Sequence, residues 1–288
     1  INRLAWSPDG QLLASGGQDR LVMVWSNDNG FRTGETSTRQ ELNLEGVFAT
    51  SGFVEELIWL PDGSSVITAD HYGNIQAFSL EMVEPADEVV ETGAELTPVD
   101  ELPAGAVYGV NVADSAVADL ALSNAGDQLA VVNGTKALTV VNPQTGVLLF
   151  AELNLAVEMH SAAYSPEDAG LVLGGADGVL RYYDLTSFDL TFSLTDFADQ
   201  GLIRTMAFNN RGTRLATGSE TGQIVIWNTT TRPYAVETVF AVGDGRVTHL
   251  SWRSDDLELG SIDNEGGFYR WQVGSWNGIE DGDEAPQT

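Results

Sequence analysis

A chain of 288 residues, 43% of them hydrophobic, is long enough to bury a large core. Its 42 acidic residues outnumber 13 basic ones, and a net charge of −29 would repel nucleic-acid phosphates and anionic membrane surfaces. Cysteine is absent, which excludes disulfides and thiolate metal sites. We therefore expect no nucleic-acid partner. The acidity fits a hydrated surface, a salt-rich habitat, a basic partner or Ca²⁺ binding.

Short runs of alternating apolar and polar residues, separated by Gly- and Asn-containing turns, predict β-strands along the whole chain. In Ile203–Asn228 such runs fall at about 203–208, 214–218 and 223–227. The first run of each repeat ends on a large residue, which we call its first anchor. In chain order the first anchors are Trp6, Trp59, Leu122, Tyr164, Phe208 and Trp252. Their last three spacings are 42, 44 and 44 residues, the period of about 40–45 expected for a four-stranded propeller blade.

A turn follows each first anchor: SPDG, LPDG, SNAG, SPED, NNRG and RSDD. Pro presets φ and Gly tolerates positive φ, so these tetrapeptides predict hairpins. The third run of each repeat ends on a second anchor, and these are Trp25, Phe78, Val141, Tyr183, Trp227 and Trp271. The two sets of anchors keep one register, which predicts six modules. We expect every first anchor to be buried between modules.

The segments LAWSPDGQLLASGGQDRLVMVW (Leu4–Trp25) and MAFNNRGTRLATGSETGQIVIWN (Met206–Asn228) resemble the WD-repeat β-propeller family. The resemblance implies an all-β propeller that is non-catalytic and presents its top face and rim loops to other proteins. The family favours a Ser/Thr–Asp–Trp network in each blade, and only Ser15, Asp19 and Trp25 fit all three positions. Asp177 matches the Asp of the fourth blade. We therefore expect packing to carry most of the stability.

The domain prediction is one propeller over residues 1–273 and an acidic tail over 274–288. Its blades are expected at about 1–53, 54–116, 117–158, 159–202, 203–246 and 247–273. An acidic insertion covers 81–105, and a polar segment covers Asn27–Arg39; either is a surface loop or a partner-contacting arm. Fourth strands are expected at Glu41–Phe48, Ala106–Val112, Val147–Leu153, Leu190–Leu194 and Tyr234–Phe240. The last repeat lacks a clear fourth strand, which favours an incomplete chain, part of a seven-bladed ring, or a six-bladed ring closed in another way.

No membrane-spanning apolar run or signal peptide is visible in the sequence. The chain opens at Ile1 within a strand-like run, which is compatible with a processed leader. We expect a soluble protein without direct membrane insertion, in an extracytoplasmic or secreted location rather than a cytoplasmic one. The oligomeric state is left open.

Polar residues gather where the family places the top face. The residues three or four before the first anchors are mostly polar: Arg3, Glu55, Glu56, Asp119, His160, Arg204 and His249. The loops between second and third strands add Asp19, Arg20, His71, Tyr72, Asp177 and Glu220. We predict that these thirteen residues form a mixed-charge docking face for a protein partner. The alternative is that they mark only where strands meet water.

Sequence motifs for catalysis are missing: no GxSxG, P-loop, dinucleotide fingerprint or HExxH occurs. Asp28-Asn29-Gly30 and Asp281-Gly282-Asp283-Glu284 carry Ca²⁺-type ligands without the twelve-residue loop. We therefore predict no enzyme activity, no cofactor and no metal site. The predicted function is a protein–protein interaction scaffold. The alternatives are a structural subunit of a secreted or cell-envelope assembly and a metal-dependent propeller hydrolase or lactonase.

Overall fold

The computed structural model describes residues 1–26, 43–80, 97–98, 102, 105–112, 115–152, 155–195, 198, 201–243 and 245–273. The chain divides into two compact units, Ile1–Leu155 (unit 1) and Ala156–Thr288 (unit 2). The polar segment Asn27–Arg39, most of the insertion 81–105, the tail 274–288 and both Ca²⁺-type motifs lie outside the described residues. No helix among the described residues has both the length and the apolar character needed to span a bilayer.

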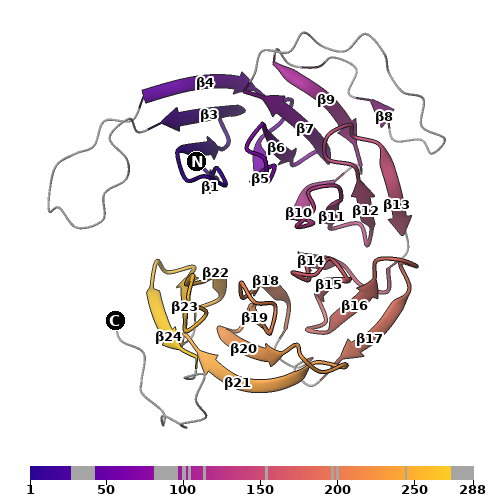
Figure 1. Cartoon of the computed structure of the whole chain (residues 1–288), viewed down its shortest axis with the longest axis vertical. Coiled ribbons are helices and arrows are strands. Elements are labelled where there is room, and N and C mark those ends of the chain that lie inside the picture. The colour runs from indigo at the N-terminus through magenta and orange to yellow at the C-terminus, as the bar shows by residue number, and fades with distance from the viewer. Residues whose placement is uncertain are drawn as a thin grey trace, which may run out of the picture. The chain divides into compact units, whose positions relative to one another are not determined.

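Unit 1 contains three antiparallel sheets, called blades one to three (Figure 1). Blade one is β1 (Arg3–Trp6), β2 (Leu12–Gly16), β3 (Leu21–Ser26) and β4 (Asn43–Ala49). Blade two is β5 (Val54–Trp59), β6 (Ser65–Asp70), β7 (Asn74–Ser79) and β9 (Ala106–Asn111), with the short β8 (Thr97–Pro98) paired to β9. Blade three is β10 (Val117–Leu122), β11 (Leu129–Asn133), β12 (Leu138–Val141) and β13 (Leu148–Glu152).

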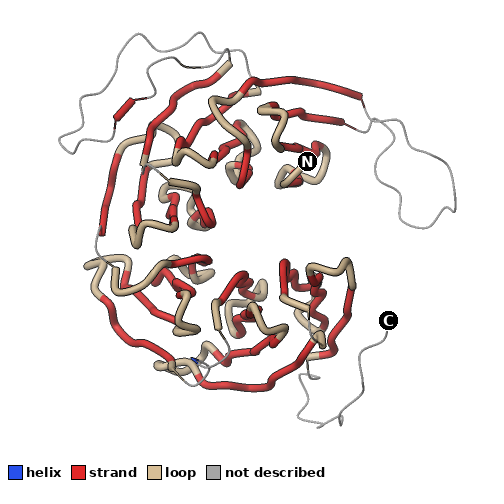
Figure 2. The backbone as a smooth tube through the Cα atoms, turned by 180° about the vertical axis from the view of Figure 1, so that it is seen from behind, coloured by secondary structure: helices blue, strands red, loops and turns tan. Residues whose placement is uncertain are grey.

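Unit 2 contains the other three antiparallel sheets, blades four to six. Blade four is β14 (Met159–Tyr164), β15 (Gly170–Gly175), β16 (Leu180–Asp184) and β17 (Leu190–Leu194). Blade five is β18 (Ile203–Phe208), β19 (Arg214–Ser219), β20 (Gln223–Asn228) and β21 (Ala235–Ala241). Blade six is β22 (Val247–Trp252), β23 (Glu258–Asp263) and β24 (Phe268–Gln272). Figure 2 shows the same strands as a tube.

The predicted strand pattern is confirmed in both units. Each sheet is a meander in which consecutive strands pair, except that in blade two β9 pairs with β7 and the short β8 lies outside it. Each first anchor ends the first strand of its own sheet. All five predicted fourth strands match observed strands to within two residues where those residues are described. Alternation predicts these strands because side chains of a strand point to opposite faces in turn.

Neighbouring blades within a unit pack through their first strands and their anchors. In unit 1 the first strands β1, β5 and β10 are neighbours, and in unit 2 so are β14, β18 and β22. Trp59 Nε1 donates a hydrogen bond to the carbonyl of Ala5 in the preceding blade at 2.9 Å. Trp252 Nε1 donates to the carbonyl of Ala207 at 2.9 Å in the same way. A first anchor therefore packs on the blade that precedes it.

The prediction that every first anchor is buried is wrong for Trp6. The side chains of Trp59 and Tyr164 are buried, whereas Trp6 is 47% exposed. Blade one has only a following blade within unit 1, so the face that carries Trp6 and the 60% exposed Leu4 is not covered by a preceding blade of that unit. Leu122, Phe208 and Trp252 are half-buried.

The turns after the first strands join neighbouring blades. The fourth residue of all six has positive φ, and it is Asp168 (φ 50) or Asp256 (φ 63) where the sequence lacks Gly. A Cβ on Gly126 would lie 2.9 Å from the Pro61 ring of the preceding blade, and one on Gly212 would lie 3.0 Å from Pro166. Glycine is therefore required there both by backbone conformation and by the close approach of the proline.

A hydrogen-bonded joint replaces the proline contact between blades five and six. The buried carboxylate of Asp256 accepts hydrogen bonds from the Asn210 backbone amide (2.8 Å), the Asn210 side-chain amide (3.0 Å) and the Arg211 amide (3.1 Å). The departures from the SPDG pattern at 209–212 and 253–256 thus compensate each other.

Second-strand hydroxyl groups bind the tryptophan anchors of three blades. The indole nitrogens of Trp25, Trp227 and Trp271 donate to Ser15 (3.3 Å), Thr217 (3.0 Å) and Ser261 (2.8 Å). Blades five and six carry Thr221 and Glu265 at the Asp position. The tryptophan–hydroxyl bond therefore forms without the Asp of the family network.

Candidate protein-interaction surface

The predicted residues lie at one end of each blade. The N-terminal end of a first strand and the turn between second and third strands, here the second turn, lie at the same end of a meander; the first turn lies at the other. We call these the upper and lower ends. The two units are described separately, so a single face formed by all thirteen residues stays a prediction.

In unit 1 the upper ends of the three first strands bring Arg3, Glu55, Glu56 and Asp119 together. Arg3 Nε donates to Glu56 Oε2 at 2.7 Å, and Arg3 Nη2 donates to Glu56 Oε1, which makes a two-point guanidinium–carboxylate pair. The hydrogen bond with Glu56, followed by the charges of Glu56, Asp119 and Glu55, raises the pKa of Arg3 against the opposing effect of burial. The positive charge of Arg3 therefore interacts with three carboxyl groups.

Glu56 is the member of this pair whose charged form is most disfavoured by burial. Its side chain is 13% exposed while that of Arg3 is 48% exposed. Burial raises the pKa of Glu56, and the hydrogen bonds and positive charge of Arg3 counter part of that rise. Arg3 and Glu56 are 53 positions apart, so the pair joins blades one and two.

A stack of rings stands beside this group at the upper end of blades one and two. The guanidinium carbon of Arg20 lies 5.4 Å from the Phe53 ring centroid. Phe53 and His71 stack with centroids 4.6 Å apart, and the His71 and Tyr72 centroids are 3.7 Å apart. Arg20, His71 and Tyr72 were predicted site residues; Phe53 was not. We call Arg20, Phe53, His71 and Tyr72 the aromatic stack.

In unit 2 the upper end carries a more balanced set of charges. Glu220 accepts a hydrogen bond from Arg204 and lies 3.6 Å from Arg246 Nη1. The hydrogen bond from Arg204 lowers the pKa of Glu220, and the charge of Arg246 adds to this. His160 Nε2 lies 3.6 Å from a carboxylate oxygen of Glu158. Burial lowers the pKa of His160 and the charge of Arg204 adds to this, while Glu158 opposes it.

Three further predicted residues are Asp177, Asp19 and His249. Asp177 forms a two-point pair with Arg181 on its own blade, at 3.0 and 2.6 Å. Asp19 accepts from the Leu21 amide at 3.3 Å. His249 is exposed on β22. Sequence reasoning missed Glu158, Arg181 and Arg246; Glu158 and Arg246 lie just before a strand, and period-two alternation gives no signal there.

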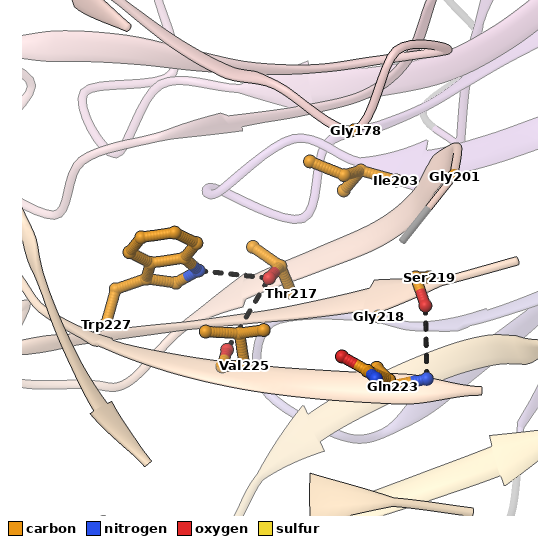
Figure 3. A pocket seen from close by; sticks show the side chains of 9 residues that line it. All are labelled: Gly178, Gly201, Ile203, Thr217, Gly218, Ser219, Gln223, Val225 and Trp227. Atoms are coloured by element: carbon orange, nitrogen blue, oxygen red, sulfur yellow. Dashed lines mark hydrogen bonds between the residues drawn. The ribbon is translucent and has the colours of Figure 1, made fainter. Parts of the chain in front are cut away.

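A small recess in unit 2 offers no comparable site (Figure 3). Its lining comes from Gly178, Gly201, Ile203, Thr217, Gly218, Ser219, Gln223, Val225 and Trp227. Space for water-sized molecules amounts to about 10 Å³, room for one water at most. In this recess Trp227 Nε1 donates a hydrogen bond to Thr217, Thr217 donates to the Val225 carbonyl, and the Gln223 backbone amide donates to Ser219. Among the described residues, no three His, Asp or Glu side chains are grouped so as to hold a metal ion.

Six antiparallel sheets, four of them four-stranded, define the class of this protein, an all-β propeller. The family model "WD domain, G-beta repeat" matches residues 1–26 and 190–228. The six repeats and the fold agree with this match, which places the chain beside the WD-repeat β-propellers, to which it is similar.

Named relatives support the same placement. Actin-interacting protein 1 of Drosophila melanogaster is 23% identical over 268 residues, which are 89% of this chain and 38% of that protein. Protein HIR1 of Candida albicans is 30% identical over 73 residues, 24% of this chain and 8% of that protein. A chain in a crystal structure of the Mitotic Checkpoint Complex superposes with a TM-score of 0.72 at 19% identity, over 95% of this chain and 76% of that one. The chain thus spans well under half of the length of these two sequence relatives. Propellers of this family are typically protein-interaction scaffolds and generally non-catalytic.

Proposed function

We propose that this chain is a non-catalytic scaffold that binds partner proteins through the upper ends of its blades. The observation that carries the proposal is the pair of Arg3 and Glu56, which holds charged side chains of two blades in one fixed position. Fixed side chains lose little conformational entropy when a partner binds, and pre-organisation of this kind supports affinity.

The charges of the two units suit different parts of a partner. In unit 1 one arginine faces three carboxyl groups, so a basic segment complements this surface. In unit 2 Arg204 and Arg246 offset Glu220 and Glu158, so a polar segment with both charges fits there. Complementary charge raises the rate of encounter and selects among partners more than it adds affinity.

The test is affinity capture with cross-linking, comparing the wild-type chain with the triple variant Arg3→Ala, Arg204→Ala and His249→Ala. A matched control replaces Arg211 and Arg253 with alanine; both lie in first turns, at the lower end. We expect partners captured by the wild type and the control to be lost from the upper-end variant. Once a partner is identified, equal affinity of the wild type and the upper-end variant refutes the proposal.

The non-catalytic part of the proposal has its own test. The purified chain is analysed for bound metal and assayed against lactone and ester substrates. A metal bound in stoichiometric amount together with turnover would favour a propeller hydrolase, and the scaffold proposal would then be withdrawn.

A further inference from the structure

The aromatic stack in unit 1 ends on a ring that faces solvent. Tyr72, on the turn between β6 and β7, is 53% exposed although its ring lies against His71 on one side. An exposed tyrosine offers a large contact area with few rotatable bonds, and tyrosine is enriched among residues that dominate binding energy. The exposed ring of Tyr72 is therefore a candidate contact point.

Hydrogen bonds of the surrounding loops hold the stack in place. The Phe53 amide donates to His71 Nδ1 at 3.1 Å, and the His71 amide donates to the Phe53 carbonyl at 3.3 Å. The Tyr72 amide donates to the buried carboxylate of Asp70 at 2.8 Å, and Asn111 Nδ2 donates to the Tyr72 carbonyl at 3.0 Å. The backbone on both sides of the rings is thus fixed before any partner binds.

One end of the stack already holds a guanidinium group. Arg20 lies over the Phe53 ring at 5.4 Å, a distance at which a cation is attracted to the negative face of an aromatic ring. The other end, the exposed face of Tyr72, offers the same chemistry to a group from outside the chain.

Charge decides which external group fits best. Unit 1 has 22 acidic and 5 basic residues, so it attracts cations and repels anions. Glu55 lies two positions after Phe53, on the strand that the stack borders. A planar guanidinium stacks on a ring better than the compact, strongly hydrated ammonium of lysine.

We propose that the aromatic stack binds an arginine side chain of a partner protein, with its guanidinium on the exposed face of Tyr72. This inference rests on the proposed scaffold function and names the chemistry that the upper end of unit 1 recognises. Neighbouring carboxylates such as Glu55 attract the basic segment, and the ring selects arginine within it.

The test uses a fluorescein-labelled peptide of alternating arginine and glycine and its lysine counterpart, with binding followed by fluorescence anisotropy. Tyr72→Leu removes the ring without changing charge, so general attraction between an acidic protein and a basic peptide is unchanged. Phe268→Leu is the matched control, because Phe268 is an exposed aromatic residue of unit 2 (63%). We expect Tyr72→Leu to weaken arginine-peptide binding about two- to fivefold and to remove the preference over lysine. The control should bind as the wild type does.

Two results overturn the inference. One is equal binding of the arginine peptide by Tyr72→Leu and the wild type; the other is an equal loss in Tyr72→Leu and Phe268→Leu. A double variant, Glu55→Gln with Asp119→Asn, separates the inference from the function beneath it. If that variant weakens binding while Tyr72→Leu does not, the stack is excluded and the charged docking end stands. If neither weakens binding, both are rejected for this class of peptide.

Discussion

The two units build a blade junction with the same two contacts, a tryptophan bonded to an alanine carbonyl and a pair of aromatic rings. At the junction of blades one and two, Trp59 bonds the Ala5 carbonyl and Phe48 packs on Phe78 with centroids 5.3 Å apart. At the junction of blades five and six, Trp252 bonds the Ala207 carbonyl at the same distance, and Phe240 stacks on Trp271 at 4.8 Å. Both junctions therefore pack neighbouring blades together in the same geometry.

The ends of these junctions differ. At the lower end, Pro61 packs against Gly126 between blades two and three of unit 1, and Pro166 packs against Gly212 in the same way in unit 2, whereas blades five and six are joined through the carboxylate of Asp256. At the upper end, Arg3 of unit 1 faces three carboxyl groups, whereas Glu220 of unit 2 lies between Arg204 and Arg246. The repeat thus sets the positions of these side chains, whereas the charge at equivalent positions differs from blade to blade.

The largest expected effect on the free energy of unfolding comes from truncating a buried tryptophan anchor in unit 2, compared with a half-exposed one in unit 1. Trp227→Ala in unit 2 removes a side chain that is 2% exposed and bonded to Thr217, and it should cost about 3–5 kcal/mol. Trp6→Ala in unit 1 should cost less, about 1 kcal/mol, because Trp6 is 47% exposed. Urea unfolding followed by circular dichroism measures both. Similar losses would show that exposure does not set the difference between these anchors.

The lower-end joint gives the next effect. Asp256→Ala leaves the amides of Asn210 and Arg211 without their acceptor, and it should lower the free energy of unfolding by about 2 kcal/mol. Pro61→Ala, at the matching joint of unit 1, removes only a packing contact and should cost about 0.5–1 kcal/mol. The two variants are compared by urea unfolding, and an equal cost would contradict the view that the joints differ in kind.

The upper-end charges give a smaller effect that depends on pH. Arg3→Ala leaves the mostly buried carboxylate of Glu56 without its partner and should cost about 1–2 kcal/mol at pH 7. The folded-state pKa of Glu56, already raised, rises further. A raised carboxyl pKa costs stability above that pKa and none once the group is protonated, so the deficit should shrink as pH falls through it.

A matched variant in unit 2 sharpens this result. Glu220→Gln removes an exposed carboxylate, and its cost should be about 0.5 kcal/mol. The double variant Arg3→Ala with Glu56→Gln should recover part of the stability lost in Arg3→Ala. A deficit of Arg3→Ala that stays constant between pH 4 and pH 8 would contradict the role assigned to Glu56.

The strands and sheets were predictable from the sequence. Which faces of the sheets are buried against a neighbouring blade was not. Alternation assigns Leu4 and Trp6 to one face of β1, yet it cannot tell whether another blade lies against that face. Likewise, Asp256 looked like a departure from the turn pattern. Its role follows only from the approach of Asn210, which is 46 positions away.

The sequence predicted at which end of the blades the candidate site residues lie. It did not predict which side chains contact one another there. Spacing from the anchors placed Arg3, Glu56 and Asp119 at one end, and the structure brings them together. Phe53 was missed because it lies in a loop before β5, where no periodicity marks it. Its stacking on His71 depends on two loops meeting, which is a tertiary property.

A similarly small effect separates the two second turns that carry the family's Asp. Asp177 in unit 2 bonds Arg181, and this hydrogen bond, with that of the Val179 amide, holds its pKa below the ordinary 3.8. Asp19 in unit 1 accepts from the Leu21 amide at the longer distance of 3.3 Å. Asp177→Asn should therefore cost about 0.5–1 kcal/mol at pH 7, and Asp19→Asn less. A lowered carboxyl pKa stabilises the fold above the ordinary value and loses that contribution as pH falls, so the gap between wild type and Asp177→Asn should narrow as the pH falls below the ordinary value of 3.8. Thermal unfolding of the three proteins between pH 3 and pH 7 measures this. A gap for Asp177→Asn that persists unchanged at the lowest pH would mean that it arises from packing around Arg181 and not from charge.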